Sequence, residues 1–457
     1  MSNSTGIDEP ITIEVWLGDS AKTGDSDEDM LPGFGNPIVD AADSFNRAHP
    51  EYRVRIRKID YRELPKAVAE AVARGNPPDV AEYVYTATQV ALDTRNRAGE
   101  PLFVPVQRAV GDRAKILGEP VVLDDLMPSA RDYWSRGGEL VSVPTSVTSN
   151  VLFANKTVLE RAGVDRMPVT WQELTAACAA VAELPDGPPH GVTWPNYGWL
   201  FHREVIGQGG LFSNGDNGRT ARSTRVFLES PELLRYVRWW RELQRSGHYF
   251  YTGELNDYFG GMAAFGRQEV AFAVTSSAVG DVMAGMAAEG GFECAVGQLP
   301  RSGDRPYSGG PFGGQSFFLT AGLPKEKEDG ALAFLQHQLN PQHAIARMRD
   351  RSLPLTRPAY EQAMAEHWAE PFPGFLVATE QLASPNRTPA AAGPLLGNLN
   401  GINGVLTAAM HDVLVSGADP ASRFRLAGEE AQALLDRHNA AALAYPPVTP
   451  DALTVTA

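Results

Sequence analysis

The first 85 residues alternate between strand-like and helix-like patterns, and this alternation limits the fold more than any other feature of the sequence. Residues 11–17 and 52–59 are rich in β-branched residues and alternate between apolar and polar side chains, as strands do. Residues 37–48 and 63–75 carry apolar residues at helical spacing, and residues 76–85 lead from a turn into another apolar strand. A β-α-β-α-β order of this kind predicts an α/β unit built on a largely parallel sheet.

The length and charge of the chain narrow the remaining choices. With 457 residues, the chain exceeds the usual size of one domain, so two or three domains are expected. Its net charge is −15 and the sequence shows no Lys/Arg cluster, which argues against binding to nucleic acid or to an anionic membrane. The two cysteines, Cys178 and Cys294, have no metal-binding spacing and could be two free thiols or one disulfide.

The sequence contains none of three common catalytic motifs. HExxH, GxSxG and a Walker A motif are all absent. The glycines of residues 309–314 precede an apolar strand, QSFFLTA, whereas glycine loops that bind phosphate lead into a helix. We therefore expect a binding protein without catalytic residues, metal or cofactor. The glycines form either a tight turn or a bare backbone that a ligand approaches closely.

Aromatic residues are concentrated in segments that read as loops or strand ends. Trp194 and Trp199 lie in a stretch rich in proline and glycine, and Tyr83 lies near the end of a predicted strand. A flat ring of this kind can stack on the C–H face of a sugar while polar neighbours bind the hydroxyl groups. Packing in the core is the alternative for each ring, and the sequence leaves both open.

Four stretches carry a resemblance to a known family. They are ITIEVWLG with SFNRAHPEYRVRI, then ARGNPPDVAEY, then GELVSVPTSVTSNVLFANKTVLERAGVDRMPVTWQEL, and finally GGQSFFLTAGLPKEKEDGALAFLQHQLNPQHAIARMRDRSLPLTRPAYE with LLGNLN after it. The chain resembles the extracellular solute-binding proteins of ABC importers, in the large sugar-binding group and most of all in its sn-glycerol-3-phosphate subgroup. The third stretch is the most specific, and the four follow the family's order.

The resemblance implies an α/β fold of two lobes, the type II periplasmic-binding-protein fold of maltose-binding proteins. It implies a ligand cleft between lobes that close by a hinge motion. The first lobe would comprise residues 1–145 and 310–358, and the second lobe residues 146–309 and 359–457.

The resemblance also implies which residues bind the ligand. Carried over position by position, with neighbouring polar residues added, the predicted set is Asp19, Tyr61, Tyr83, Thr148, Ser149, Trp194, Trp199, Ser276, Ser277, Gly313, Gly314, Gln315, Ser352 and Asn398.

Three positions depart from the glycerol-3-phosphate pattern. Tyr83 replaces a glutamate, Ser352 replaces a tyrosine, and Leu395 replaces the arginine that would hold a phosphate. Arginine is the preferred bidentate partner of phosphate, so Leu395 favours a neutral sugar, a sugar-like polyol or a sugar mimic. A phosphorylated polyol such as glycerol-3-phosphate or a glycerophosphodiester is the alternative, and it would need another cation.

Family membership also implies a location and a partner. The N-terminal stretch MSNSTGIDEP has neither the basic nor the apolar region of a signal peptide. Because the family is exported, we expect an extracellular lipoprotein or a periplasmic protein whose signal has been removed. It would act as a monomer with the ABC permease as its partner. A cytoplasmic enzyme or sensor on the same fold is the alternative that a missing signal supports.

Overall fold

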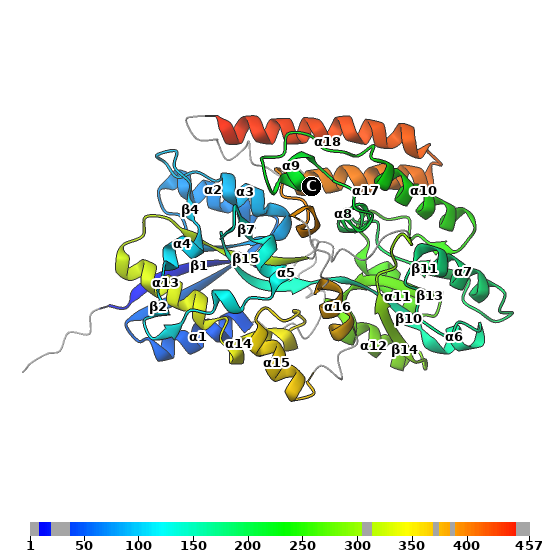
Figure 1. The fold of residues 1–457 in the computed structure, drawn as a ribbon, viewed down its shortest axis with the longest axis horizontal. Helices are drawn as coiled ribbons and strands as arrows, with labels where there is room; N and C mark the ends of the chain where they lie inside the picture. The colour runs from blue at the N-terminus through cyan, green and yellow to red at the C-terminus, as the bar shows by residue number, and fades with distance from the viewer. Residues whose placement is uncertain (1–8, 20–36, 304–312, 369–373, 384–388, 445–457) are drawn as a thin grey trace, which may run out of the picture. The chain divides into compact units, whose positions relative to one another are not determined.

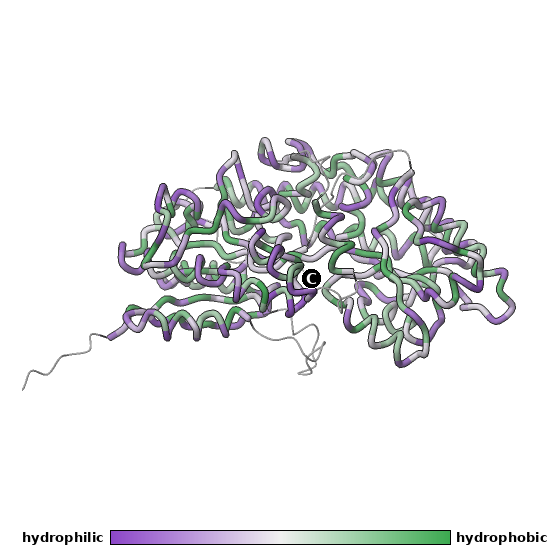
Figure 2. Tube along the Cα trace, turned by 60° about the horizontal axis from the view of Figure 1, so that its bottom comes forward, coloured by the Kyte–Doolittle hydropathy of each residue, from purple (hydrophilic) through white to green (hydrophobic). Residues whose placement is uncertain are grey.

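The computed structural model describes residues 9–19, 37–303, 313–368, 374–383 and 389–444 (Figure 1). These residues form two compact units. The first unit contains the described residues within Met1–Ser146, Gly314–Gln362 and Ala441–Thr454, and the second contains those within Val147–Gly313 and Ala363–Ala440. Hydrophobic stretches lie mostly inside each unit and hydrophilic residues mostly at its outer turns (Figure 2).

The first unit is built on a six-stranded sheet with the order β2-β1-β3-β15-β4, in which β9 also pairs with β15. Strands β1, β2 and β3 are parallel, as the alternating pattern predicts, whereas β15 runs antiparallel to β3 and β4. The bounds are β1 (Ile11–Asp19), β2 (Tyr52–Asp60), β3 (Val80–Val84), β4 (Phe103–Val104), β9 (Val143–Thr148) and β15 (Gly313–Thr320).

Helices cover both faces of this sheet, α2 and α3 on one side and α1 and α14 on the other (Figure 1). Helix α1 buries Ile38, Ala41, Ala42 and Phe45, an apolar stripe at helical spacing. Helix α2 is capped by Gly75, whose left-handed backbone (φ 78°) lets its N–H donate to carbonyls of the last turn. The bounds are α1 (Pro37–Ala48), α2 (Leu64–Arg74), α3 (Thr88–Asp93), α13 (Lys325–His337) and α14 (Pro341–Arg349).

Strand β2 lies at the edge of the sheet and is strongly basic. Arg53, Arg55 and Arg57 are exposed along it, and the guanidinium of Arg57 lies 4.6 Å from the ring of Trp16 on β1. Charged side chains on an edge strand disfavour pairing with a second sheet. These arginines form a local basic cluster, so the expectation that the chain has no Lys/Arg cluster was wrong for this strand.

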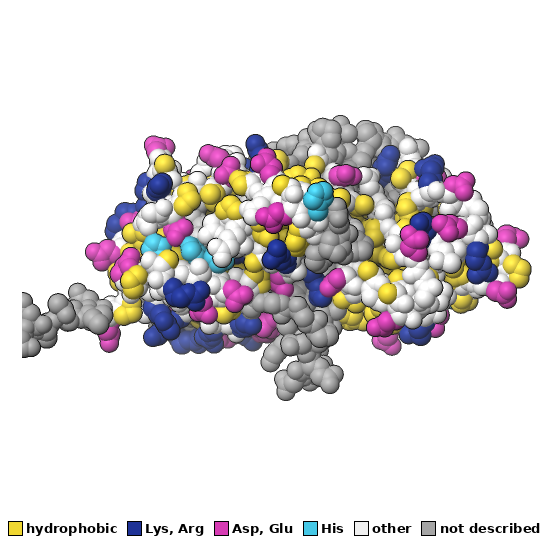
Figure 3. Space-filling model, turned by 90° about the horizontal axis from the view of Figure 1, so that it is seen from below, with side chains coloured by type: hydrophobic (Ala, Val, Ile, Leu, Met, Phe, Trp, Pro, Cys, Tyr) yellow, Lys and Arg dark blue, Asp and Glu magenta, His cyan; other side chains and the backbone are white. Residues whose placement is uncertain are grey.

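A histidine cluster links helices of the first unit. Glu119, in β6 (Glu119–Pro120), binds His49 at 3.0 Å and His337 at 2.9 Å. The Nε2 atoms of His337 and His343 lie 3.2 Å apart. Burial lowers the pKa of His343 to about 4, so the His343 ring is neutral at neutral pH. Figure 3 shows histidine side chains gathered on one face of this unit, and their contacts fit a structural role.

The second unit has a five-stranded sheet with the order β12-β11-β13-β10-β14. Strand β10 runs antiparallel to β13 and β14, and β11 runs parallel to β12 and β13. The strands are β10 (Asn150–Asn155), β11 (His190–Thr193), β12 (Tyr249–Phe250), β13 (Val270–Ser276) and β14 (Cys294–Gln298). Helices that pack in this unit include α7 (Trp171–Ala182), α8 (Gly198–Gly207), α10 (Pro231–Arg245), α16 (Phe375–Leu382), α17 (Leu399–Val415) and α18 (Pro420–Leu443).

Both cysteines are free thiols. Cys178 is buried in α7, and Cys294 is half-buried in β14, so the disulfide alternative does not hold. Across the described ranges, we find no helix with the length and apolar character needed to cross a membrane.

Candidate ligand-binding site

The first unit gathers polar side chains where its parallel strands end. Strands β1, β2 and β3 end at Asp19, Asp60 and Val84, and the carboxyl ends of parallel strands lie at one edge of a sheet. Gln315 on β15 donates from Nε2 to the Gly18 carbonyl at 2.9 Å. A methyl group built on Gly18 would lie 3.3 Å from Cβ of Tyr61. The structure thus brings Gln315 and Tyr61 of the predicted set to Gly18, the residue before Asp19.

A buried glutamate lies at the centre of this group, and the sequence did not predict it. Glu82 accepts hydrogen bonds from the Gly18 N–H at 3.0 Å and from the Thr145 hydroxyl at 2.5 Å. Gln315 Nε2 lies 3.3 Å from the same carboxylate. Burial raises the pKa of Glu82 to about 7, against the lowering effect of these hydrogen bonds. We call Gly18, Glu82, Thr145 and Gln315 the glutamate corner.

Arg347 on α14 approaches the glutamate corner. Its Nη1 donates to the Thr145 carbonyl at 3.0 Å, and its side chain is buried. Burial lowers the pKa of Arg347 to about 10, while the charge of Glu82 acts in the opposite direction. The predicted Ser352 follows this helix, and its hydroxyl donates to the Leu353 carbonyl at 2.9 Å. Arg347 is therefore a second residue that the sequence did not predict.

Tyr83 points away from this group. Its ring lies between Phe103 and Phe318, at centroid distances of 5.8 and 5.5 Å, and only 1% of the residue is exposed. Successive residues of a strand face opposite sides of a sheet, so Glu82 faces the polar group and Tyr83 faces the core. The ligand-binding role expected for Tyr83 therefore conflicts with its position, and the geometry favours a packing role.

The second unit joins the two predicted serine segments. Ser149 lies between β9 and β10, and Ser277 follows β13. The Ser277 N–H donates to the Ser149 carbonyl at 2.7 Å, and the Ser149 N–H donates to Ser277 Oγ at 3.2 Å. The Ser276 N–H donates to the Tyr258 hydroxyl at 3.2 Å. We call Thr148, Ser149, Ser276 and Ser277 the serine corner.

Two side chains that the sequence did not predict converge on Ser149. Its Oγ accepts a hydrogen bond from Gln381 Nε2 at 2.8 Å and one from Arg203 Nη1 at 3.2 Å. Gln381, on α16, also donates to the Asn150 carbonyl at 2.8 Å and accepts from the Leu299 N–H at 2.8 Å. Arg203 lies on α8, one turn after Trp199, so both side chains share a face of that helix.

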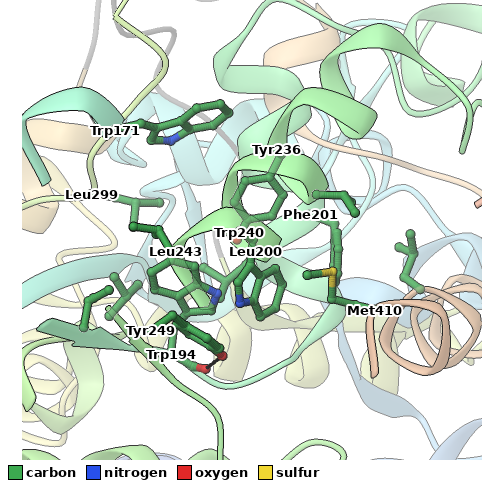
Figure 4. Close-up of a cluster of buried hydrophobic side chains, with 14 of the residues drawn as sticks. Trp171, Trp194, Leu200, Phe201, Tyr236, Trp240, Leu243, Tyr249, Leu299 and Met410 are labelled. Carbon is green, nitrogen blue, oxygen red and sulfur yellow. Dashed lines mark hydrogen bonds between the residues drawn. The ribbon is translucent and has the colours of Figure 1, made fainter. Parts of the chain in front are cut away.

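The two predicted tryptophans have different surroundings. Trp194 stacks on Trp239 with the ring centroids 5.6 Å apart, packs 4.6 Å from Tyr249, and is 4% exposed. Figure 4 shows Trp194 with Trp240 and Tyr249 in the main hydrophobic cluster of the second unit. With neighbours packed around its ring, Trp194 has a core position that conflicts with the expected stacking on a ligand.

Trp199 lies instead beside the serine corner. A methyl group built on Gly313 would lie 3.1 Å from the Trp199 ring and 2.9 Å from Thr148 Oγ1. Because Gly313 has no side chain, Thr148 and Trp199 can approach its backbone closely. Glycines 309–312 lie outside the described residues.

Asn398 completes the predicted set, and Leu395 is the position where the family pattern has an arginine. Asn398 directly precedes α17 with a left-handed backbone (φ 50°), and its side chain accepts from the Gly401 N–H at 3.2 Å. It thus acts as a helix cap. Leu395, where an arginine was expected by resemblance, is buried, and its N–H donates to the Asn217 carbonyl at 2.8 Å. In the described part of the chain, no group of three or more His, Cys, Asp or Glu is arranged to hold a metal ion.

Comparison with known proteins identifies the family. The sequence model of one protein family, the bacterial extracellular solute-binding proteins, matches residues 40–371. The chain belongs to this family. Among curated relatives of this solute-binding protein is the sn-glycerol-3-phosphate-binding periplasmic protein UgpB. The Salmonella typhimurium protein is 25% identical over 417 residues, which is 88% of this chain and 90% of the relative. The Escherichia coli K12 protein is 25% identical over 415 residues, with the same shares.

Solved structures confirm the expected two-lobed, maltose-binding-protein-like fold of this solute-binding protein. The sugar-binding protein MalE from Xanthomonas citri has a TM-score of 0.70 at 17% identity, over 94% of this chain and 98% of that one. The cyclic alpha-maltosyl-1,6-maltose binding protein from Arthrobacter globiformis has a TM-score of 0.69 at 19% identity, over 93% and 99%. UgpB from Mycobacterium tuberculosis, in complex with glycerophosphocholine, has a TM-score of 0.66 at 20% identity, over 94% and 98%.

Proposed function

We propose that this solute-binding protein captures a small, hydroxyl-bearing solute of the sugar or polyol class and delivers it to the permease of an ABC importer. It does so as a monomer at the outer face of the cytoplasmic membrane, either lipid-anchored or free in the periplasm, and it catalyses no reaction. Some relatives are named for binding sn-glycerol-3-phosphate or a maltose-type sugar, and these names support a small polar solute.

The observation that carries this proposal is the reciprocal bonding of Ser149 and Ser277. One hydrogen bond between backbone groups, of 2.7 Å, and one from the Ser149 N–H to Ser277 Oγ, of 3.2 Å, hold the two residues in register. A hydroxyl group both donates and accepts, so a fixed pair of serines is complementary to the hydroxyl groups of a sugar or polyol. A solute that left such a buried group unpaired would lose about 1–3 kcal/mol of binding free energy, and this penalty is a source of specificity.

Calorimetric titration of the purified chain against a panel of monosaccharides, oligosaccharides, polyols and their charged derivatives tests the proposal. We expect one member to bind with 1:1 stoichiometry and a dissociation constant in the micromolar range or below. Ser277→Ala should weaken that binding roughly 10-fold, through the loss of one hydrogen bond. The absence of heat with every member of the panel would exclude this ligand class.

A further inference from the structure

Strand β2 carries a row of basic side chains along one face. Its sequence, YRVRIRKID, contains Arg53, Arg55, Arg57 and Lys58, and its one acidic residue, Asp60, stands at the last position. The three arginines alternate with other residues, so their side chains share one face of the strand at intervals of about 6.5 Å. All three are exposed. We call Arg53, Arg55 and Arg57 the arginine row.

The backbone at the outer edge of β2 is protected by other residues. The side chain of Asn46, on α1, donates from Nδ2 to the Val54 carbonyl at 3.1 Å and accepts from the Val54 N–H at 2.7 Å. Two residues earlier, the Tyr52 N–H donates to the His49 carbonyl at 3.0 Å. These bonds occupy outward-facing groups that an added strand would need. The first half of the edge is therefore blocked without the arginine row, which favours a binding role for the row.

The arginine row can still bind negative charges from outside the chain. Glu14 on β1 is paired with Arg55 in the sheet, with Oε1 3.8 Å from Nη1, and both side chains are exposed. An exposed ion pair of this kind contributes little. The Arg57 guanidinium lies over the Trp16 ring at 4.6 Å. Stacking on a ring leaves the N–H groups at the rim of a guanidinium available to oxygen atoms.

An anionic membrane surface is the partner that fits such a row. Three evenly spaced guanidinium groups match a surface that repeats its negative charge rather than one small solute. Phospholipid head groups provide this repeat, and anionic ones attract basic residues near the surface. The net charge of −15 opposes this approach. Screening limits such repulsion to roughly 8 Å at physiological ionic strength, so the charges nearest the surface decide the contact.

We propose that the arginine row docks the first unit on the surface of a membrane that contains anionic phospholipids. The contact is peripheral, with the guanidinium groups bound to head groups. This inference goes beyond solute capture and rests on the proposed function only for the location at a membrane. It also revises the expectation from composition, which weighed the charge of the whole chain instead of the charge of this strand.

Sedimentation of the purified chain with lipid vesicles tests the proposal. One set of vesicles contains phosphatidylcholine alone, and the other contains equal parts of phosphatidylcholine and phosphatidylglycerol. At physiological salt we expect roughly 100-fold stronger binding to the vesicles with phosphatidylglycerol, from three arginines near an anionic surface. Added salt should release the chain, because it screens the charges. Equal binding to both vesicle types, or binding to neither, would overturn the proposal.

Variants of the arginine row assign the effect to these side chains. The combined change Arg53→Gln, Arg55→Gln and Arg57→Gln should weaken binding to the phosphatidylglycerol vesicles roughly 100-fold, or about 5-fold per arginine. Lysine at the same three positions keeps the charge and should retain most of the binding. If the triple glutamine variant does not fold, Arg53→Gln alone should still weaken binding by about 5-fold.

An equal change of net charge in the second unit provides the control. Arg238 and Arg245 on α10 and Arg437 on α18 are exposed. Their combined replacement by glutamine should leave vesicle binding largely unchanged, because charges remote from the contact are screened. Equal weakening by the two triple variants would show that overall charge controls binding, and it would overturn the proposal.

Solute binding separates this inference from the proposed function. The arginine row lies outside both corners, so its triple glutamine variant should bind the calorimetric panel as the wild type does. Salt-sensitive vesicle binding without any solute ligand would overturn only the proposed function. Solute binding without vesicle binding would overturn only this inference. Retention of the chain on immobilised polyglutamate, without vesicle binding, would assign the row to an acidic protein and would also overturn it.

Discussion

The carboxylate of Glu82 accepts a 2.5 Å hydrogen bond from the hydroxyl of Thr145, across 63 residues of sequence. Thr145 lies on β9, one residue before the last residue of this segment of the first unit. The bond therefore ties the centre of the parallel sheet to the place where the chain leaves this unit. Because it involves a buried ionisable group, it makes the stability of the first unit depend on pH.

Replacing Glu82 by glutamine should flatten that dependence. Burial raises the pKa of Glu82 from 4.5 to about 7, so between these values the folded chain binds the proton more tightly than the unfolded chain. Stability from this group is full below pH 4.5 and is lost as pH rises through 7. Relative to Glu82→Gln, the wild type should lose roughly 3 kcal/mol of unfolding free energy between pH 4.5 and 8. Urea unfolding at several pH values measures the difference, and parallel curves would refute it.

The two tryptophans should give opposite phenotypes. Trp194→Ala removes a ring from the main core of the second unit and should lower the unfolding free energy by about 3–5 kcal/mol. Trp199→Ala should instead weaken ligand binding, since its ring lies beside Thr148 and Gly313. Urea unfolding and calorimetry on both variants separate the effects. Unchanged ligand affinity in a folded Trp199→Ala protein would remove Trp199 from the site.

Gly314 should tolerate no side chain. Its backbone has φ 153°, and a methyl group there would lie 2.1 Å from the Ser146 carbonyl oxygen. Gly314→Ala should therefore cost about 2 kcal/mol or more of unfolding free energy. Gly285→Ala is the control, because Gly285 lies inside a helix with open space around it. That change should be neutral or stabilise by up to about 1 kcal/mol. Equal effects of the two substitutions would contradict the steric argument.

Gln381 should be essential for the order of the serine corner. Gln381→Leu removes hydrogen bonds to Ser149 Oγ, the Asn150 carbonyl and the Leu299 N–H, all buried groups. We expect a loss of about 2 kcal/mol or more in unfolding free energy together with weaker solute binding. Thermal unfolding with and without the bound solute measures both. A variant with wild-type stability would show that water replaces these bonds.

Local patterns explain what the sequence predicted well. The strands and helices of the first 85 residues follow from apolar periodicity, which depends on near neighbours. The spacing of Thr170 and Glu173 predicts a capping box, and the structure has it at the start of α7. The resemblance to the family also brought Ser149 and Ser277 into one set, although 128 residues separate them.

Long-range contacts explain what the sequence missed. Gln381 meets Ser149 across 232 residues, and no local pattern marks either Gln381 or Arg203 as its partner. Strand alternation predicts that the side chains of Glu82 and Tyr83 face opposite sides of the sheet. Which of the two sides packs in the core depends on contacts with residues far away in the sequence. Trp194 lies in a stretch rich in proline and glycine, yet that stretch is covered by the aromatic side chains of α10. The sequence left ligand stacking and core packing open for this ring, and these long-range contacts favour packing.

The most direct test of the account is a crystal structure of the chain with the tightest-binding solute of the panel. We predict an oxygen of the solute within hydrogen-bonding distance of Ser149 Oγ or Ser277 Oγ, on the face of α8 that carries Trp199 and Arg203. A solute bound elsewhere, with both serine hydroxyls bonded only to protein groups, would contradict it.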